Sequence, residues 1–294
     1  MASTLSSDST QDHITATKKA LGQTAFNSKN YSQALKTYEG IIAANSPKIV
    51  DHVSLSNAHA ALGEMYFYGH GVTQSYTQAL HHFNAVIAIN TPKMVDPLLL
   101  SQAQNYIGQM YFDGLGVAKS YTKAVRYFNG VVATNTPHVV DPASLSAAQF
   151  PLGVMYYNGL GDLTQSYTQA FSYFNAALKN TKDTRKIPIM QYYLGLMNLT
   201  GQGTAQDTAQ ANIYFASAFD GLNNGLTNTH SATDKIARAV MNYFLGQMYT
   251  NGYGVTQNSA TALRYYREVT PDAPWEYAHA QAIINASNFS NAAK

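Results

Sequence analysis

Two sets of residues in this chain could carry chemistry: five short glycine loops and nine histidines. Each loop has the pattern Gly-x-Gly and precedes a helix-like segment, as in YFYGHGVTQSYTQAL at 66–80, so it could hold a phosphate at a helix N-terminus. A dinucleotide fingerprint, however, needs a preceding strand and a third glycine in the order GxGxxG. None of the five loops has the third glycine, and a helical pattern precedes each. We therefore interpret them as bends between helices.

The histidines form no recognisable metal or catalytic set. His81 and His82 are adjacent, which places them about 100° apart on a helix, and His70 lies on the preceding loop. No Glu-x-x-His motif near these three completes a zinc set, and the chain has no cysteine. No nucleophile elbow of the G-x-S-x-G type occurs either. The sequence thus predicts no catalytic residue, no metal and no cofactor, and a protein that is not an enzyme.

Composition narrows the function classes further. The net charge is +2, from 18 Lys and Arg against 16 Asp and Glu, so no basic footprint for nucleic acid is expected. No apolar run approaches the roughly 20 residues needed to span a bilayer, and the first residues, MASTLSSDSTQDH, lack the pattern of a signal peptide. The sequence indicates a soluble protein, cytoplasmic or exported, without membrane insertion.

The elements that position these residues are six copies of one repeat. A glycine that follows a large apolar residue recurs 41 to 51 residues apart, and in five copies a Gly-x-Gly begins six residues later. We call it the anchor glycine of each copy: Gly22, Gly63, Gly108, Gly153, Gly195 and Gly246. Past each loop come an alanine and, four residues on, an aromatic residue. A period of this length is typical of helical arrays.

Capping chemistry divides each copy into two helices, which we name helix A and helix B. Helix A is predicted to end at the first glycine of Gly-x-Gly and to start at an Asp or Thr cap twelve residues before the anchor glycine: Thr10, Asp51, Asp96, Asp141, Asp183 and Asp234. Helix B is predicted to start at Asn30, Ser75, Ser120, Ser166, Asp207 and Asn258. In the first three copies it should end in left-handed caps ahead of a proline, at Asn45, Asn90 and Asn135.

A glycine inside a helix lowers helix stability by about 1 kcal/mol relative to alanine. Its presence in every helix A therefore requires a packing interaction that restores this stability. We expect that interaction to be close approach of helix B, with Ala79 facing Gly63 and with Phe83 filling space beside them. Pro151 and Pro188 fall inside predicted helices, so irregular stacking is expected around the last two copies.

These residues closely resemble the Sel-1-like repeat family, relatives of tetratricopeptide repeats with the pattern A-x-x-x-L-G-x-x-Y-x-x-G-x-G-V. The segments that carry the resemblance include ALGEMYFYGHGV, YIGQMYFDGLGV and YFLGQMYTNGYGV. The resemblance implies an all-α fold, a right-handed α/α superhelix (solenoid) of about six antiparallel helix pairs plus a C-terminal capping helix.

The predicted domain organisation follows the repeat. We expect a flexible N-terminus at 1–9, a first pair of tetratricopeptide type at 10–45, five Sel-1-like pairs at 51–270 and the capping helix at 272–290. That last helix should cover the final pair with Trp275, Tyr277, Ala278, Ala282 and Ile283.

The resemblance also implies a function. Members of this family commonly act as non-enzymatic scaffolds or adaptors in signalling, secretion, protein quality control and, in bacteria, interactions with host cells. Tetratricopeptide superhelices bind partners on a concave face lined by helix A residues three before, one after, and four or five after the anchor glycine. These positions include Glu64, and they give our candidate partner-binding surface: Phe67, Tyr68, Asn105, Gln109, Phe112, Phe150, Tyr157, Asn158, Tyr192, Tyr243 and Gln247.

Aromatic rings beside amides suit an extended peptide or a loop of a protein partner, because rings supply contact area and amides can hydrogen-bond its backbone. The same chemistry suits a non-protein ligand such as a glycan or cell-wall fragment, which stays as the alternative. A further alternative is that half of these aromatic residues only pack between neighbouring repeats.

Overall fold

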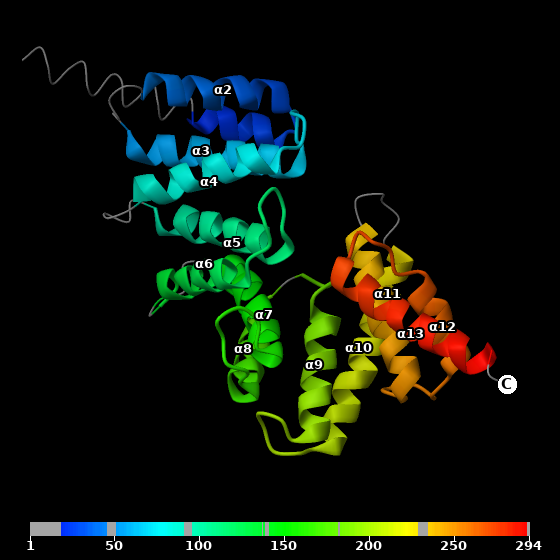
Figure 1. The fold of residues 1–294 in the computed structure, drawn as a ribbon. Coiled ribbons are helices and arrows are strands. Elements are labelled where there is room, and N and C mark those ends of the chain that lie inside the picture. Colours follow the sequence, from blue (N-terminus) through cyan, green and yellow to red (C-terminus); the bar gives the residue numbers. More distant parts are fainter. Residues whose placement is uncertain are drawn as a thin grey trace, which may run out of the picture. The chain divides into compact units, whose positions relative to one another are not determined.

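The computed structural model describes residues 19–45, 51–90, 96–136, 138, 141–181, 183–228 and 235–292. Regular structure in these ranges consists of helices alone, joined by turns and loops (Figure 1). The fold is an all-α solenoid of helical pairs, as the repeat predicts. The predicted flexible segment 1–9 and the predicted caps Thr10 and Asp234 lie outside the described residues.

Helices A and B alternate along the chain. Residues 19–27 are helical, and the helices that follow are α2 (Tyr31–Ala44), α3 (His52–Tyr68), α4 (Tyr76–Asn90), α5 (Pro97–Asp113), α6 (Tyr121–Thr134), α7 (Pro142–Asn158), α8 (Tyr167–Asn180), α9 (Ile187–Thr200), α10 (Thr208–Asn228), α11 (Lys235–Asn251), α12 (Ser259–Arg267) and α13 (Pro274–Ala292). The odd-numbered helices from α3 to α11 are A helices, and the even-numbered ones are B helices. In the pairs α3–α4, α5–α6, α9–α10 and α11–α12, the two helices pack directly on each other.

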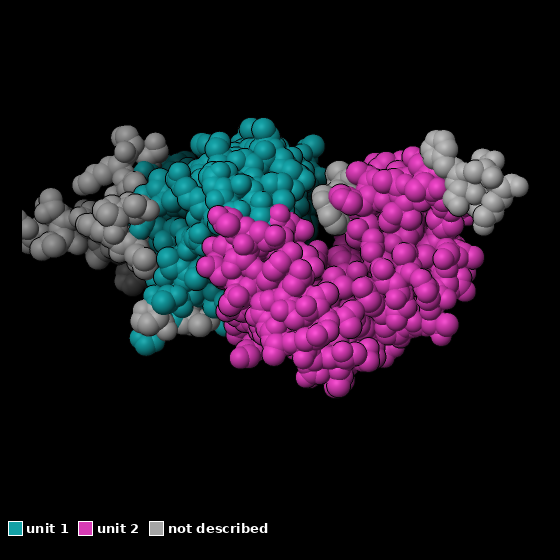
Figure 2. All heavy atoms as spheres, turned by 60° about the horizontal axis from the view of Figure 1, so that its bottom comes forward, with its two compact units in different colours: residues 1–152, 159–163 teal, residues 153–158, 164–294 magenta. Residues whose placement is uncertain are grey.

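The chain divides into two compact units, which Figure 2 colours separately. The first unit holds residues 1–152 and 159–163, and the second holds 153–158 and 164–294. Within the first, α4 packs on both α3 and α5, so consecutive pairs share an apolar core. Within the second, α9 packs on α8 and α10, and α11 packs on α10 and α12.

Side-chain caps start most helices at the predicted residues. Asp51, for example, accepts a hydrogen bond from the N–H of Ser54 at 3.0 Å. Equivalent caps are made by Asp96, Asp141, Asn30, Ser75, Ser120, Ser166, Asp207 and Asn258. The predicted cap at Asp183 is wrong. Its carboxylate is bound by the N–H and guanidinium of Arg185, and α9 begins only at Ile187, without a side-chain cap.

The Gly-x-Gly loops are bends between helices, as predicted. Both glycines of every loop have a positive φ, between 64° and 79°. The first closes helix A, since the N–H of Gly69 donates to the carbonyl of Met65. A Cβ on the second, Gly71, would collide with Tyr31 at the start of the preceding helix B. The two glycines therefore allow the chain to reverse direction and allow the loop to contact the previous copy closely.

Each anchor glycine makes room for an aromatic ring of helix B. A Cβ on Gly63 would lie 2.5 Å from Cε1 of Phe83, and one on Gly108 would lie 2.7 Å from Cε1 of Phe128. The rings in this position are all at most 1% exposed: Tyr38, Phe83, Phe128, Phe174, Phe215 and Tyr266. The predicted close approach exists, but the atoms nearest to Gly63 belong to the ring and not to Ala79.

Buried asparagines end the first three B helices: Asn45, Asn90 and Asn135. Nδ2 of Asn135 donates to the Val131 carbonyl at 2.9 Å and to Ser101 Oγ at 3.0 Å, and its Oδ1 accepts from the N–H of Asp141 at 2.8 Å. Asn90 makes the same three kinds of bond. The predicted left-handed caps are wrong, because φ is −97° at Asn45 and −95° at Asn135. The backbone N–H of the asparagine still donates to the last carbonyls of helix B, as at Asn45 and Asn135, and its side chain ties the end of helix B to the start of the next helix A.

The junction between α10 and α11 departs from the register of the others. In four copies the second loop glycine contacts the first residue of the preceding helix B, in the pairs Gly71–Tyr31, Gly116–Tyr76, Gly161–Tyr121 and Gly203–Tyr167. Gly254 instead contacts Phe215, seven residues beyond the start of α10, or about 10 Å along the helix. The predicted irregularity is confirmed here. Pro151 does lie inside α7, but Pro188 lies in the first turn of α9, where a missing N–H is harmless.

The last helix, α13, packs on α11 and α12. Its buried residues include Ala280 and Ile284, whereas Ala278 and Ala282, which we predicted to cover the final pair, are exposed. Apolar residues occur all round this helix, so the sequence pattern does not fix the buried face. Tyr277 and Ile283 are half-buried, and the side chain of Trp275 lies outside those described.

Candidate functional site

The candidate partner-binding surface is half-buried along most of its length. In the first unit Tyr68 is 53% exposed, and the remaining predicted residues are half-buried: Phe67, Asn105, Gln109, Phe112 and Phe150. In the second unit Asn158 is exposed, and Tyr157 and Gln247 are half-buried. Tyr192 and Tyr243 are only 5% and 6% exposed.

Tyr192 and Tyr243 pack inside the second unit. Their ring centroids lie 5.0 Å and 5.5 Å from that of Phe244. Burial, with the neighbouring Tyr266 adding to it, raises the pKa of Tyr243 to about 12. These two residues contribute packing, which was one of the two alternatives for the aromatic residues of this surface.

Four ring pairs of one geometry fix other aromatic residues of the surface. The aromatic residue four after the anchor glycine meets the first tyrosine of helix B edge to face, with centroids 5.3 to 5.6 Å apart and interplanar angles of 67° to 74°. The pairs are Phe26–Tyr31, Phe67–Tyr76, Phe112–Tyr121 and Tyr157–Tyr167. These contacts hold the rings in place before any partner binds.

Glu64 brings a carboxyl group to the same surface of the first unit. Its Oε1 accepts a hydrogen bond from the Tyr106 hydroxyl at 3.0 Å, and the Tyr106 ring stacks on Phe83 with centroids 4.6 Å apart. Burial raises the pKa of the Glu64 carboxyl, and the bond from Tyr106 opposes that shift. Burial, and after it the Glu64 charge, raises the pKa of Tyr38 to about 12 and moves that of Tyr106 well above its usual range.

Sequence analysis missed Tyr106, which lies two residues before an anchor glycine. Tyr193 occupies the equivalent position in its copy and stacks on Phe174, as Tyr106 stacks on Phe83. In these two copies an aromatic residue at this position reaches the buried ring of the preceding copy, whereas Phe244, at the same position before Gly246, contacts Tyr192 and Tyr193 instead.

His70, inside the first glycine loop, joins rings from two copies. It stacks on Tyr31 with centroids 5.0 Å apart and an interplanar angle of 7°, and on Tyr68 at 5.5 Å and 25°. Its Nδ1 is buried and has no hydrogen-bond partner among the described residues. The loop thus contributes an aromatic surface, and not a phosphate cradle.

A second histidine cluster lies between α3 and α4. The Nδ1 atoms of His59 and His82 are 3.0 Å apart, and Tyr66 stacks on His82 with centroids 5.6 Å apart. Burial, followed by the charge of neighbouring histidines, lowers the pKa of both His59 and His82 to about 4. The pair is therefore uncharged at neutral pH. The described residues contain no group of three His, Cys, Asp or Glu side chains that could hold a metal ion.

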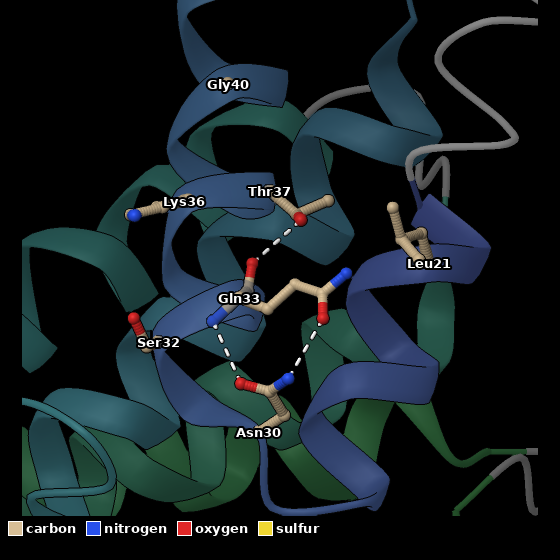
Figure 3. A pocket seen from close by; sticks show the side chains of 7 residues that line it. All are labelled: Leu21, Asn30, Ser32, Gln33, Lys36, Thr37 and Gly40. Carbon is tan, nitrogen blue, oxygen red and sulfur yellow. Dashed lines mark hydrogen bonds between the residues drawn. The ribbon is translucent and has the colours of Figure 1, made fainter.

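An open groove of about 480 Å³ lies between residues 19–27 and α2 (Figure 3). Its lining comprises Leu21, Asn30, Ser32, Gln33, Lys36, Thr37 and Gly40. Several polar groups there already bond one another, since Asn30 Nδ2 donates to Gln33 Oε1 at 2.9 Å and the Thr37 hydroxyl donates to the Gln33 carbonyl at 2.8 Å. The lining offers no acid–base pair or nucleophile with an activating base. Nor does any helix in the described ranges combine the length and apolar character needed to cross a bilayer.

The sequence profile of one known family matches the chain in five places. The profile is that of the Sel1 repeat, and it matches residues 56–85, 101–129, 146–181, 188–221 and 239–268, together more than half of the chain. Each matched segment runs from helix A through a Gly-x-Gly bend into helix B. The chain belongs to the Sel1 repeat family. Sel1 repeats typically form protein-interaction scaffolds, and their solenoids are typically non-catalytic.

Two crystal structures of Sel1-type proteins share the fold. A Sel1 repeat protein from Oxalobacter formigenes is 21% identical, with a TM-score of 0.51 over 85% of this chain and 83% of that one. A protective antigen of uropathogenic Escherichia coli strains, which displays an SLR fold, is 21% identical, with a TM-score of 0.52 over 95% of this chain and 58% of that one. At this identity the likeness shows the fold alone. No curated protein sequence matches this chain.

Proposed function

We propose that this Sel1 repeat chain is a scaffold that binds an extended segment of a protein partner along the part of the candidate partner-binding surface that belongs to the first unit. The observation that carries the proposal is the recurrence of half-buried aromatic residues, held edge to face, in successive copies of the first unit: Phe26, Phe67 and Phe112. A repeating chain such as a peptide fits a repeating row of contacts better than a compact ligand does.

The rings of this row are suited to binding because they are already ordered. Phe112 packs edge to face on Tyr121 and lies 6.3 Å from Phe128, so little side-chain entropy remains to be lost when a partner binds. Part of the Phe112 ring surface stays accessible, since the residue is half-buried. Burying that remaining surface under an apolar side chain of the partner supplies binding free energy.

Amides next to the row can bind the backbone of the segment. Oδ1 of Asn105 is buried and has no hydrogen-bond partner among the described residues. An unpaired buried acceptor costs free energy. If the half-buried Asn105 side chain turns towards a bound peptide, an N–H of the peptide would remove that cost. Asn105 and Phe112 both belong to α5, so one helix offers a backbone contact and a side-chain contact.

A peptide-display library selected on the folded protein tests this proposal. Enriched peptides are expected to lose affinity at least tenfold for Phe112→Ala. The matched control is Tyr111→Ala, which removes an equally half-buried ring that stacks on Tyr127 instead, with centroids 5.8 Å apart. Affinity that is the same for both variants and the parent protein would refute binding at this surface. Enrichment of no peptide, together with hits on a glycan array, would favour the non-protein ligand.

A further inference from the structure

Glu64 is a half-buried carboxylate that forms no ion pair among the described residues, although His70 lies close enough to interact with it electrostatically. Across the described residues, the one ion pair joins Arg185 to Asp183, and no lysine or arginine pairs with Glu64. Its hydrogen bond comes from the Tyr106 hydroxyl. A carboxylate has about four acceptor positions, so most of its capacity is available to a group that approaches from solvent.

Aromatic rings from three successive copies form a connected series of contacts that begins at Tyr106, whose hydroxyl binds this carboxylate. Tyr68 lies one turn beyond Glu64 on α3 and is therefore on the same side of the helix. Its ring, 53% exposed, is 6.3 Å from that of Tyr106 and 5.5 Å from that of His70. His70 in turn stacks on Tyr31 of the first copy. The carboxylate is thus joined through Tyr106 to a group of rings that includes the exposed Tyr68.

We propose that Glu64, Tyr68 and Tyr106 form a subsite for one basic side chain, arginine or lysine, of a bound peptide. This subsite rests on the proposed function, because it takes one residue of a segment that lies on the candidate partner-binding surface. A flat guanidinium can bond the carboxylate with two N–H groups and stack on a tyrosine at the same time, which an ammonium cannot, so arginine is preferred.

Charge complementarity selects this occupant over an acidic one. The carboxylate is partly removed from water, and pairing with a cation recovers interaction free energy that solvent no longer supplies. The tyrosine ring faces add a cation–π attraction. An acidic or phosphorylated side chain would meet the Glu64 charge with no lysine or arginine paired to it. The subsite therefore adds selectivity for positive charge to a surface whose other contacts are apolar or amide.

The probe for this subsite is Nα-acetyl-arginine amide, compared with Nα-acetyl-citrulline amide, which has the same shape without the charge. In an NMR titration of the full chain, the arginine probe is expected to shift the Glu64 carboxyl and Tyr68 ring resonances and to lower the pKa of Glu64. The citrulline probe should bind at least tenfold more weakly. Equal binding of the two probes would overturn the proposal.

Variants separate the subsite from general charge attraction. Glu64→Gln keeps an acceptor for the Tyr106 hydroxyl, so the fold is preserved, and it should weaken the arginine probe at least tenfold. Glu39→Gln, which removes an exposed carboxyl on α2, is the matched control and should leave binding unchanged. Tyr68→Ala should weaken binding severalfold through the lost ring. Unchanged binding to Glu64→Gln would refute the subsite.

The two proposals fail in different ways. If library peptides bind with Phe112 dependence but without any preference for arginine or lysine, the subsite is wrong and the scaffold function stands. If the arginine probe binds through Glu64 but no peptide is enriched, the residues bind a cation, and the scaffold function and the peptide occupant are both wrong.

Discussion

The anchor glycines give the sharpest stability prediction. In Gly63→Ala, the added Cβ would lie 2.5, 2.8 and 2.9 Å from Cε1, Cδ1 and Cζ of Phe83, a ring that is only 1% exposed. Overpacking of this kind costs about 3 kcal/mol at the upper end of its usual range, and the helix propensity of alanine returns about 1 kcal/mol. We expect a net loss of about 2 kcal/mol, or roughly 4 °C in melting temperature.

Gly40→Ala provides the matched control, because this helical glycine has no atom within 4 Å of an added Cβ. It should gain up to about 1 kcal/mol from helix propensity alone. Thermal and urea unfolding, followed by circular dichroism, measure both variants. A partial recovery in the double variant Gly63→Ala with Phe83→Leu would locate the strain at the ring. A Gly63→Ala protein as stable as the parent would show that the ring can move aside, and would refute the packing argument.

Three further predictions concern the turns and the histidine pair. Asn135→Ala should lower the free energy of unfolding by about 2 kcal/mol in urea titrations, because it removes three buried hydrogen bonds: one to the Val131 carbonyl within α6, one to Ser101 of α5 and one from the N–H of Asp141 at the start of α7. Gly116→Ala should lower the free energy of unfolding by at least as much, measured by thermal unfolding. The added Cβ collides with Tyr76, and alanine is strained at a backbone φ of 67°. The pKa of His59 and His82 is about 4 in the folded protein, below the value of about 6.5 in the unfolded chain. As the pH falls, the unfolded chain therefore binds protons before the folded protein does. The contribution of the pair to the free energy of unfolding should be complete above about pH 6.5 and should be lost as the pH falls towards 4. Unfolding midpoints across that range check this, and the loss should be smaller in His59→Gln.

The fold was predictable from local chemistry because each repeat contains the capping residues that mark the ends of its helices. Asp51 and Asp96 cap helix A where the sequence places them, and Gly69 closes it in the left-handed region. One error arose where a neighbouring side chain competed for the capping group. Asp183 could have capped a helix, but Arg185 binds its carboxylate instead. No propensity argument identifies that competition.

The spacing from the anchor glycine named the residues of the candidate site but did not predict their exposure. Phe67 and Phe112 are half-buried and paired with tyrosines, and their binding to a partner stays a prediction. The same spacing placed Tyr192 and Tyr243 on the surface, yet both are buried in the second unit, where Gly254 contacts α10 out of register with the other copies. A register change between copies depends on how two helices meet, and a single sequence does not report it.

The position of an aromatic residue within its copy decides whether its ring stabilises the fold or can bind a partner. The Phe128 ring packs against the anchor glycine Gly108 and is fully buried, so Phe128→Ala should lower the free energy of unfolding by about 3–5 kcal/mol. Tyr106 stacks across to the ring of the preceding copy, which also contributes to packing. Phe112 packs on Tyr121 but remains half-buried, so its truncation should cost less stability than that of Phe128. Because the first two positions already hold the copies together, the third can present ring surface to a partner without loss of the fold.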